Sequence, residues 1–264
     1  MENKKIVVSA KRLSKTFTTH ENNLFSIKQY LQSIFKGRGK AKKIYALSDV
    51  NFDVYKGECF GVIGGNGSGK STLLKLIMDS YRPDKGSTLT VNGKLMRLSL
   101  GMGFDPNLTA RENIYVNGTI LGLSFKKIGN IFEEIINFTE LAEFIDVPVR
   151  HYSKGMLSRL KFAVAIHAET DILLIDEFFG GVGDLAFKKK SDEIFVKSFM
   201  NGKSIILVSH SMKTIQKHCH RVMLLDKGKQ VMIGKPKEVI EEYKRRSAGK
   251  KNPLRDPTKL KPIL

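Results

Sequence analysis

One stretch of the sequence decides the fold: Gly64-Gly65-Asn66-Gly67-Ser68-Gly69-Lys70-Ser71-Thr72. It satisfies the phosphate-loop pattern G-x-x-x-x-G-K-[ST], in which glycines let consecutive backbone amides turn toward phosphate oxygens. We expect Lys70 to reach the β- and γ-phosphates and the Ser71 hydroxyl to ligate magnesium. The apolar run 59–64 predicts a buried strand before the loop, and 72–78 predicts a helix whose N-terminal dipole favours an anion. The stretch therefore predicts a nucleotide site.

Two carboxylates follow a second predicted strand, at 171–175, which is expected to be a central parallel strand. We expect Asp176 to hold magnesium through water and Glu177 to polarise the attacking water. A third strand is predicted at 204–208, and His210, which follows it, is expected to contact the γ-phosphate or to order the attacking water. By itself, an Asp-Glu strand end is more often a helix cap and a lone histidine is usually structural. The phosphate loop upstream favours the catalytic interpretation.

The segment YSKGM, at 152–156, opens a further amphipathic helix. Alone it would be only an N-cap followed by a glycine. Over residues 1–243, however, the order of motifs resembles that of the ATPase subunit of ABC transporters. That family carries a Walker A loop, an LSGGQ-type signature, a Walker B strand, a D-loop and a switch histidine. The resemblance implies that Ser153, Lys154 and Gly155 are a degenerate signature that binds nucleotide, that Asp184 is the D-loop aspartate, and that His210 is the switch.

Other segments resemble those of one subgroup of this family. Residues 100–114, the segment VGDLAFKKK at 182–190 and a long basic insert are similar to those of exporters of teichoic acid, O-antigen and capsular polysaccharide. The resemblance implies ATP and Mg²⁺ as cofactors, and ATP hydrolysis that drives export of a lipid-linked glycan through a separate integral membrane permease. One loop and one signature per chain imply a head-to-tail homodimer, with each ATP between the Lys70 loop of one copy and Ser153 of the other.

Three features depart from the family pattern. No glutamine occurs between Lys94 and Arg111, so the usual Q-loop ligand is missing, and backbone, water or another side chain must replace it. The signature ends in Met156 rather than glutamine. Phe17 and Tyr45 are both candidates for stacking on adenine. Phe17 is favoured because it fits the usual place after the first strand.

The expected fold class is α/β, a P-loop NTPase (RecA-like) core with an N-terminal antiparallel β region and an inserted helical subdomain, as in ABC ATPases. The length of 264 residues suits one large domain with an inserted lobe. We expect the ATPase domain to span 1–243, including a basic amphipathic insert at 20–44 and a helical subdomain at about 95–165, and a basic tail to span 244–264. Shorter patterns predict strands over 6–9 and 50–54 and a helix over 128–144.

The net charge of +19 implies an anionic partner. Most of the excess lies in the insert and in the tail, which favours an anionic membrane surface over nucleic acid. In the insert, apolar residues at helical spacing precede a basic cluster; they are Leu24, Ile27, Leu31 and Ile34. We expect this helix at the boundary between permease and membrane, and the protein to be peripheral, at the cytoplasmic face of the cell membrane.

Neither a signal-peptide core nor an apolar run long enough for a membrane span occurs in the sequence. Cys59 and Cys219 lie far apart along the chain, and we interpret them as buried structural thiols. Three alternatives stay open: an ABC ATPase of another lipid or drug exporter, an ABC ATPase associated with nucleic acid or ribosomes, and a small-molecule kinase. The kinase would not need the signature, D-loop and switch histidine in this order.

Overall fold

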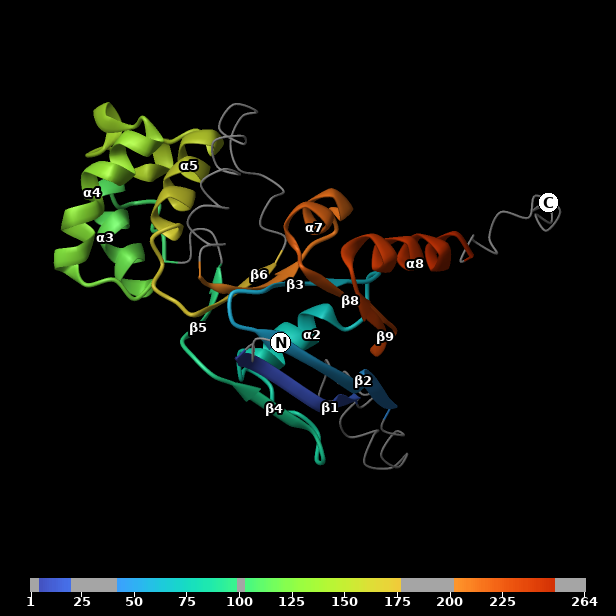
Figure 1. Cartoon of the computed structure of the whole chain (residues 1–264). Coiled ribbons are helices and arrows are strands. Elements are labelled where there is room, and N and C mark those ends of the chain that lie inside the picture. The colour runs from blue at the N-terminus through green and yellow to red at the C-terminus, as the bar shows by residue number, and fades with distance from the viewer. Residues whose placement is uncertain (1–4, 20–41, 99–102, 177–201, 250–264) are drawn as a thin grey trace, which may run out of the picture.

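The structure is a computed structural model that describes residues 5–19, 42–98, 103–176 and 202–249 (Figure 1). Residues 20–41 of the helix predicted within 20–44, the predicted catalytic Glu177 and the predicted D-loop Asp184 lie outside these residues. The central element is a nine-stranded sheet in the order β4-β1-β2-β9-β8-β3-β7-β6-β5.

One side of the sheet, from β8 to β5 in this order, is parallel. Its strands are β3 (Cys59–Ile63), β5 (Leu95–Leu98), β6 (Ile172–Asp176), β7 (Ser204–Val208) and β8 (Arg221–Asp226). Strands β3 and β7 are buried along their whole length, which is why they are near-continuous apolar runs in the sequence. The strand predicted over 204–208 is confirmed, and β3 and β6 lie within one residue of the predicted bounds.

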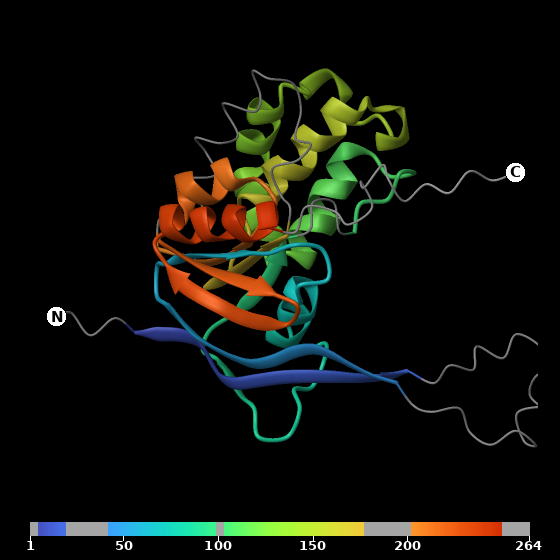
Figure 2. The same ribbon diagram turned by 90° about the vertical axis from the view of Figure 1, so that its right-hand side faces the viewer.

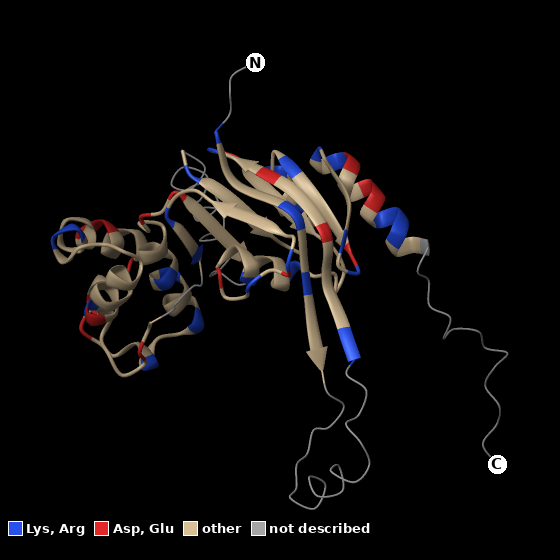
Figure 3. Cartoon of the chain, turned by 90° about the horizontal axis from the view of Figure 1, so that it is seen from below, with Lys and Arg blue, Asp and Glu red and all other residues tan. Residues whose placement is uncertain are grey.

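The N-terminal antiparallel region is larger than predicted. Strands β1 (Ile6–Thr19) and β2 (Lys42–Tyr55) span 14 residues each and pair with each other, and β4 (Thr88–Val91) pairs with β1. Strand β9 (Lys229–Gly234) joins β8 in antiparallel fashion. The outer ends of the two strands, residues 14–19 of β1 and 42–46 of β2, contain no buried residue, so alternation of apolar residues did not identify them. Residues 42–44, assigned to the insert from sequence, belong to β2, and the insert leaves the end of this two-stranded ribbon (Figure 3).

Helices cover both faces of the sheet. Helix α2 (Lys70–Ile77) packs on one face in a cluster that includes Leu73, Leu174 and Val208. Helices α7 (Met212–His218) and α8 (Pro236–Gly249) cover the opposite face, and Figure 2 shows them across strands β8 and β9 from β1 and β2. None of the described helices has the length and apolar character needed to cross a membrane.

Helix α8 continues six residues past the boundary that the sequence suggested at 243. Glu242 accepts hydrogen bonds from Arg245 at 2.7 Å and from Arg246 at 2.6 Å, the i+3 and i+4 neighbours that stabilise a helix surface. Val239 and Ile240 are buried against the sheet. The first basic residues of the predicted tail are therefore helical.

The helical subdomain comprises α3 (Ala110–Ile120), α4 (Phe125–Thr139) and α5 (Lys154–Ala165), with 3-10 turns at Ala142–Phe144 and Val149–His151. It has its own apolar cluster and stands to one side of the sheet (Figure 1). The helix predicted over 128–144 was wrong at both ends. Ser124 caps it at the start, and it ends where Glu140 adopts a left-handed conformation.

Two thiols that the sequence places far apart meet in the core. The Sγ atoms of Cys59 and Cys219 lie 3.8 Å apart, and both residues are buried. The hydrogen bond between them, together with burial, raises the pKa of the Cys219 thiol. Both are free thiols, as predicted.

Candidate nucleotide site

The glycine-rich loop joins the carboxyl end of β3 to the first residue of α2. Gly67 has φ +72° and Gly69 has φ +105°, values that side-chain-bearing residues rarely adopt. A Cβ atom on Gly69 would lie 2.7 Å from the carbonyl oxygen of Ala46 in β2. The loop conformation therefore requires glycine at position 69 for two independent reasons.

The loop closes around its own lysine. The Nζ atom of Lys70, which is buried, donates hydrogen bonds to the carbonyl oxygens of Gly64 at 2.7 Å and Gly65 at 3.0 Å. This places a buried cation inside the loop. The first N–H groups of α2, from Lys70 through Thr72, have no partner within the helix and face the same region.

A buried hydroxyl in the loop supports a ligand site. Ser68 is 1% exposed, and its Oγ atom has no hydrogen-bond partner among the described residues. Asn66 and Ser71 are exposed, whereas Thr72 is half-buried. A buried cation, helix N-terminal amides that have no partner within the helix and an unpartnered hydroxyl are donors that a polyphosphate chain can use, so these residues fit a nucleoside triphosphate.

The sheet brings Asp176, a predicted magnesium ligand, and His210, a predicted catalytic residue, to the same end of the strands as the loop. Val208 pairs with Val62 on one side and with Asp176 on the other. Asp176 thus lies two strand spacings, about 10 Å, from the strand that delivers the loop. His210, two residues beyond Val208, follows the strand between them and is exposed. The structure thereby unites Lys70, Asp176 and His210, which are far apart in sequence.

Asp176 carries an ion pair that the sequence analysis missed. The Nη2 atom of Arg97 lies 3.0 Å from its Oδ2 atom. Arg97 is in register with Leu174, whose side chain shares a sheet face with that of Asp176 because strand side chains alternate. The only signal in the sequence was a charged residue inside the apolar run 95–98.

The two candidate aromatic residues lie on the ribbon of β1 and β2. Phe17 is in register with Ile44, and Tyr45 with Thr16, so the two rings occupy opposite faces. The Phe17 ring packs edge-on against Tyr81, just beyond α2, with centroids 5.2 Å apart. Tyr45 is 64% exposed.

The signature-like segment begins α5, in the helical subdomain. Ser153 is its N-cap, and the Ser153 Oγ atom accepts a hydrogen bond from the Met156 amide at 3.1 Å. The preceding Tyr152 donates its hydroxyl to the Phe144 carbonyl at 2.6 Å, and burial raises the pKa of Tyr152 to about 12. Ser153 and Lys154 are exposed, and Gly155 is half-buried. The structure does not place this segment beside the phosphate loop of the same chain.

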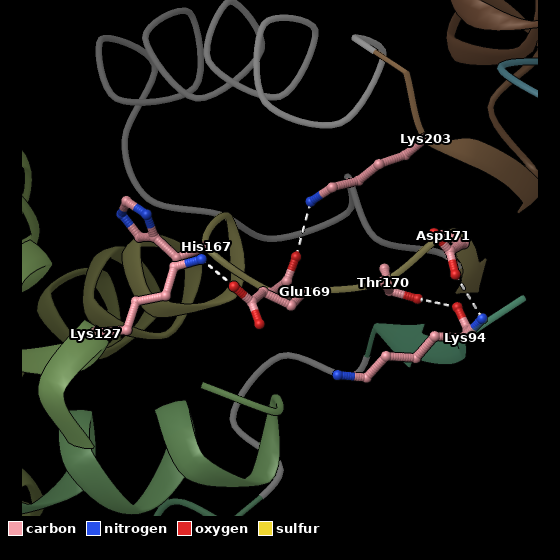
Figure 4. A pocket seen from close by; sticks show the side chains of 8 residues that line it. Lys94, Lys127, His167, Glu169, Thr170, Asp171 and Lys203 are labelled. Carbon is pink, nitrogen blue, oxygen red and sulfur yellow. Dashed lines mark hydrogen bonds and ion pairs between the residues drawn. The ribbon is translucent and has the colours of Figure 1, made fainter. Parts of the chain in front are cut away.

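A cavity of about 480 Å³ lies elsewhere, at the amino ends of β5, β6 and β7 (Figure 4). Its polar groups largely satisfy one another. Lys127 forms an ion pair with Glu169, Lys203 donates to the carbonyl of Ala168 at 2.8 Å, and the Lys94 amide donates to Asp171 at 2.7 Å. Because nucleotide-binding loops of parallel sheets lie at the carboxyl ends of strands, this cavity is separate from the candidate site.

Comparison with known proteins agrees with this geometry. The sequence model described as "ABC transporter" matches residues 47–180. The chain is 44% identical to the O-antigen export system ATP-binding protein RfbB of Klebsiella pneumoniae, over 79% of this chain and 85% of that protein. It is 47% identical to RfbB of Myxococcus xanthus, over 77% and 46%, and 38% identical to the teichoic acids export ATP-binding protein TagH of Lactococcus lactis, over 93% and 52%. The chain thus spans about half the length of the last two relatives.

Two solved structures share the fold. An ATP-binding subunit of an ABC transporter matches with a TM-score of 0.66 and 21% identity, over 91% of this chain and 94% of that one. A dimeric ATP-binding cassette, in a post-hydrolysis state with ADP and phosphate, matches with a TM-score of 0.64 and 21% identity, over 87% and 98%. The expected architecture, a P-loop core with an antiparallel β region and a helical subdomain, is confirmed. By its phosphate loop, its fold and its sequence, this chain belongs to the ABC transporter family.

Proposed function

We propose that this chain is the ATP-hydrolysing subunit of an exporter of lipid-linked cell-surface polysaccharide or teichoic acid. The observation that carries the proposal is the phosphate loop closed on Lys70, set at the same sheet edge as Asp176 and His210. Similarity to O-antigen and teichoic acid export proteins over most of the chain supports the class of cargo.

In this proposal the loop binds the ATP phosphates, and Lys70 exchanges its carbonyl partners for phosphate oxygens. The Ser71 hydroxyl and the Asp176 carboxylate supply the oxygen ligands that Mg²⁺ prefers, and they would hold the ion through direct and water-mediated contacts. The bound ion would offset negative charge on the phosphates. Glu177 polarises the attacking water, and His210 orients it or contacts the γ-phosphate.

We further propose that two copies bind ATP between them, with the Lys70 loop of one copy facing Ser153, Lys154 and Gly155 of the other. Ser153 and Lys154 are solvent-exposed and belong to a different part of the chain from the loop, which supports their use by a second molecule. Asp184 lies at the same interface in this arrangement. Phe17 stacks on adenine in preference to Tyr45, because its face of the ribbon packs near the end of α2.

The partner of this subunit is an integral membrane permease, and the chain acts at the cytoplasmic face of the membrane. The described end of the β1–β2 ribbon carries exposed Lys42 and Lys43, and it leads into the basic insert (Figure 3). Such a basic projection suits an anionic lipid surface. No described feature favours nucleic acid or another lipid or drug as the ligand.

Co-purification from detergent-solubilised membranes tests the proposal. We expect the chain to capture a polytopic membrane protein, and the pair in vesicles to hydrolyse ATP faster when a lipid-linked glycan is supplied. The Glu177→Gln variant is the matched control, because it should retain the partner but lose the stimulated hydrolysis. Capture of RNA or ribosomes without a membrane protein would instead support the nucleic-acid alternative, and stimulation by an unrelated lipid would support another cargo.

A further inference from the structure

The ion pair between Arg97 and Asp176 occupies the carboxylate assigned above to magnesium. The pair is short, at 3.0 Å, and it uses one carboxylate oxygen and one guanidinium nitrogen. Among the described residues, no other ion pair involves Asp176. A cation is therefore already present at the position where a magnesium site needs negative charge.

The position of Arg97 makes this cation displaceable. Strand β5 is the last strand in the order of the sheet, and within the described part of the chain no further strand pairs with its outer side. The Arg97 side chain is 41% exposed, whereas that of Asp176 is 24% exposed. The long arginine side chain can rotate toward solvent without disturbing the apolar cluster, while Asp176 stays fixed at the end of a buried strand.

Electrostatics predicts that Arg97 lowers the affinity of Asp176 for magnesium. A monovalent cation on a carboxylate lowers the affinity of that carboxylate for a second cation, because the two compete for the same oxygens and repel each other. We propose that Arg97 is a positioning residue: it holds the Asp176 carboxylate until magnesium displaces it, and it thereby sets the magnesium concentration that nucleotide binding requires. This inference rests on the proposed role of Asp176.

The test is an equilibrium titration that does not depend on turnover. The affinity of the purified chain for a fluorescent ATP analogue is measured at increasing concentrations of free Mg²⁺. The midpoint is the Mg²⁺ concentration that gives half of the total increase in affinity. Arg97→Gln removes the charge at similar size, and we expect it to lower this midpoint by up to about fivefold, the upper end of the range for a partly exposed ion pair. Arg97→Lys keeps the charge and should stay near the unmutated value.

Two controls isolate the effect. Arg111→Gln breaks a comparable arginine–aspartate pair, with Asp146 at 2.8 Å, in the helical subdomain, and it should leave the midpoint unchanged. In an Asp176→Asn background the effect of Arg97→Gln should vanish, because Arg97 acts through that carboxylate. Thermal melts in EDTA verify that each variant is folded.

The outcomes separate the inference from the proposed function. If Arg97→Gln leaves the Mg²⁺ midpoint unchanged, or if Arg111→Gln shifts it equally, the role of Arg97 is wrong while the magnesium site can still stand. If Mg²⁺ does not alter nucleotide affinity in the unmutated chain, the magnesium site itself is wrong, and the inference falls with it.

Discussion

The ammonium group of Lys70 and the carbonyl oxygen of Gly64 lie 2.7 Å apart, in a hydrogen bond that spans the phosphate loop. Two backbone carbonyls of the loop accept hydrogen bonds from this ammonium group, and the same group can donate to phosphate oxygens instead. The lysine therefore contributes to the shape of the loop as well as to the charge of the site.

Replacement of this lysine tests that relationship. Lys70→Ala should weaken ATP binding by about 10- to 100-fold, the range for a lost hydrogen bond to a charged group, and should lower hydrolysis as well. Isothermal titration calorimetry measures the ATP affinity, and a phosphate-release assay measures the rate of hydrolysis. Lys237→Ala, at an exposed position of α8, is the control. Unchanged affinity and rate in Lys70→Ala would overturn the assignment of the loop.

Glu177→Gln should separate binding from chemistry. The amide keeps the volume and hydrogen bonding of the side chain but cannot accept the proton of the attacking water, so turnover should fall by at least about 100-fold while ATP still binds. Size-exclusion chromatography with ATP should then show a trapped dimer. Hydrolysis near the unmutated rate would exclude Glu177 as the base.

Two glycines of the loop should respond differently to alanine. Gly69→Ala should destabilise the fold by about 1–3 kcal/mol, because position 69 has a positive φ and the added methyl group meets backbone atoms of β2. Gly65→Ala is the matched control, since a Cβ atom there meets nothing within 4 Å. Urea denaturation followed by circular dichroism measures both. Equal losses in the two variants would contradict the described loop geometry.

The Tyr152 hydroxyl predicts a loss of stability at high pH. Its pKa is raised to about 12 in the folded chain, chiefly by burial, whereas an unfolded tyrosine titrates near 10. The folded state therefore retains a proton that the unfolded state releases, and this contribution is lost as pH rises from about 10 to 12. In Tyr152→Phe, thermal melts across this interval should show a smaller fall in Tm. An identical fall in both proteins would exclude Tyr152 as the source.

Charge reversal in the basic insert tests the membrane role. Replacing Arg38, Lys40, Lys42 and Lys43 with glutamate should reduce sedimentation with anionic vesicles while leaving ATP binding intact, because attraction to the lipid surface depends on these charges. Raised salt should weaken binding of the unmutated chain in the same assay. If the variant still sediments and supports export, these residues are only a solvated surface.

Several features were predictable from the sequence because they depend on neighbouring residues. The phosphate loop is one continuous motif, so Lys70 and its glycines could be assigned directly. Strands β3, β6 and β7 are short apolar runs bounded by polar residues or glycine. A parallel strand that is buried on both faces is made almost entirely of apolar residues, so it can be recognised from its composition. The places of Asp176 and His210 were also predictable, since Asp176 ends one such strand and His210 lies two residues beyond another.

Other features depend on which strands become neighbours, and only the tertiary structure decided them. Arg97 reaches Asp176 because β5 pairs with β6 across 79 positions of sequence, and Cys59 meets Cys219 because β3 and the end of α7 share one core. Likewise, register alone places Phe17 and Tyr45 on opposite faces of the ribbon. The local sequence determines which secondary structure a segment can form. The pairing of distant segments is set by burial of the whole core, and no local pattern encodes it.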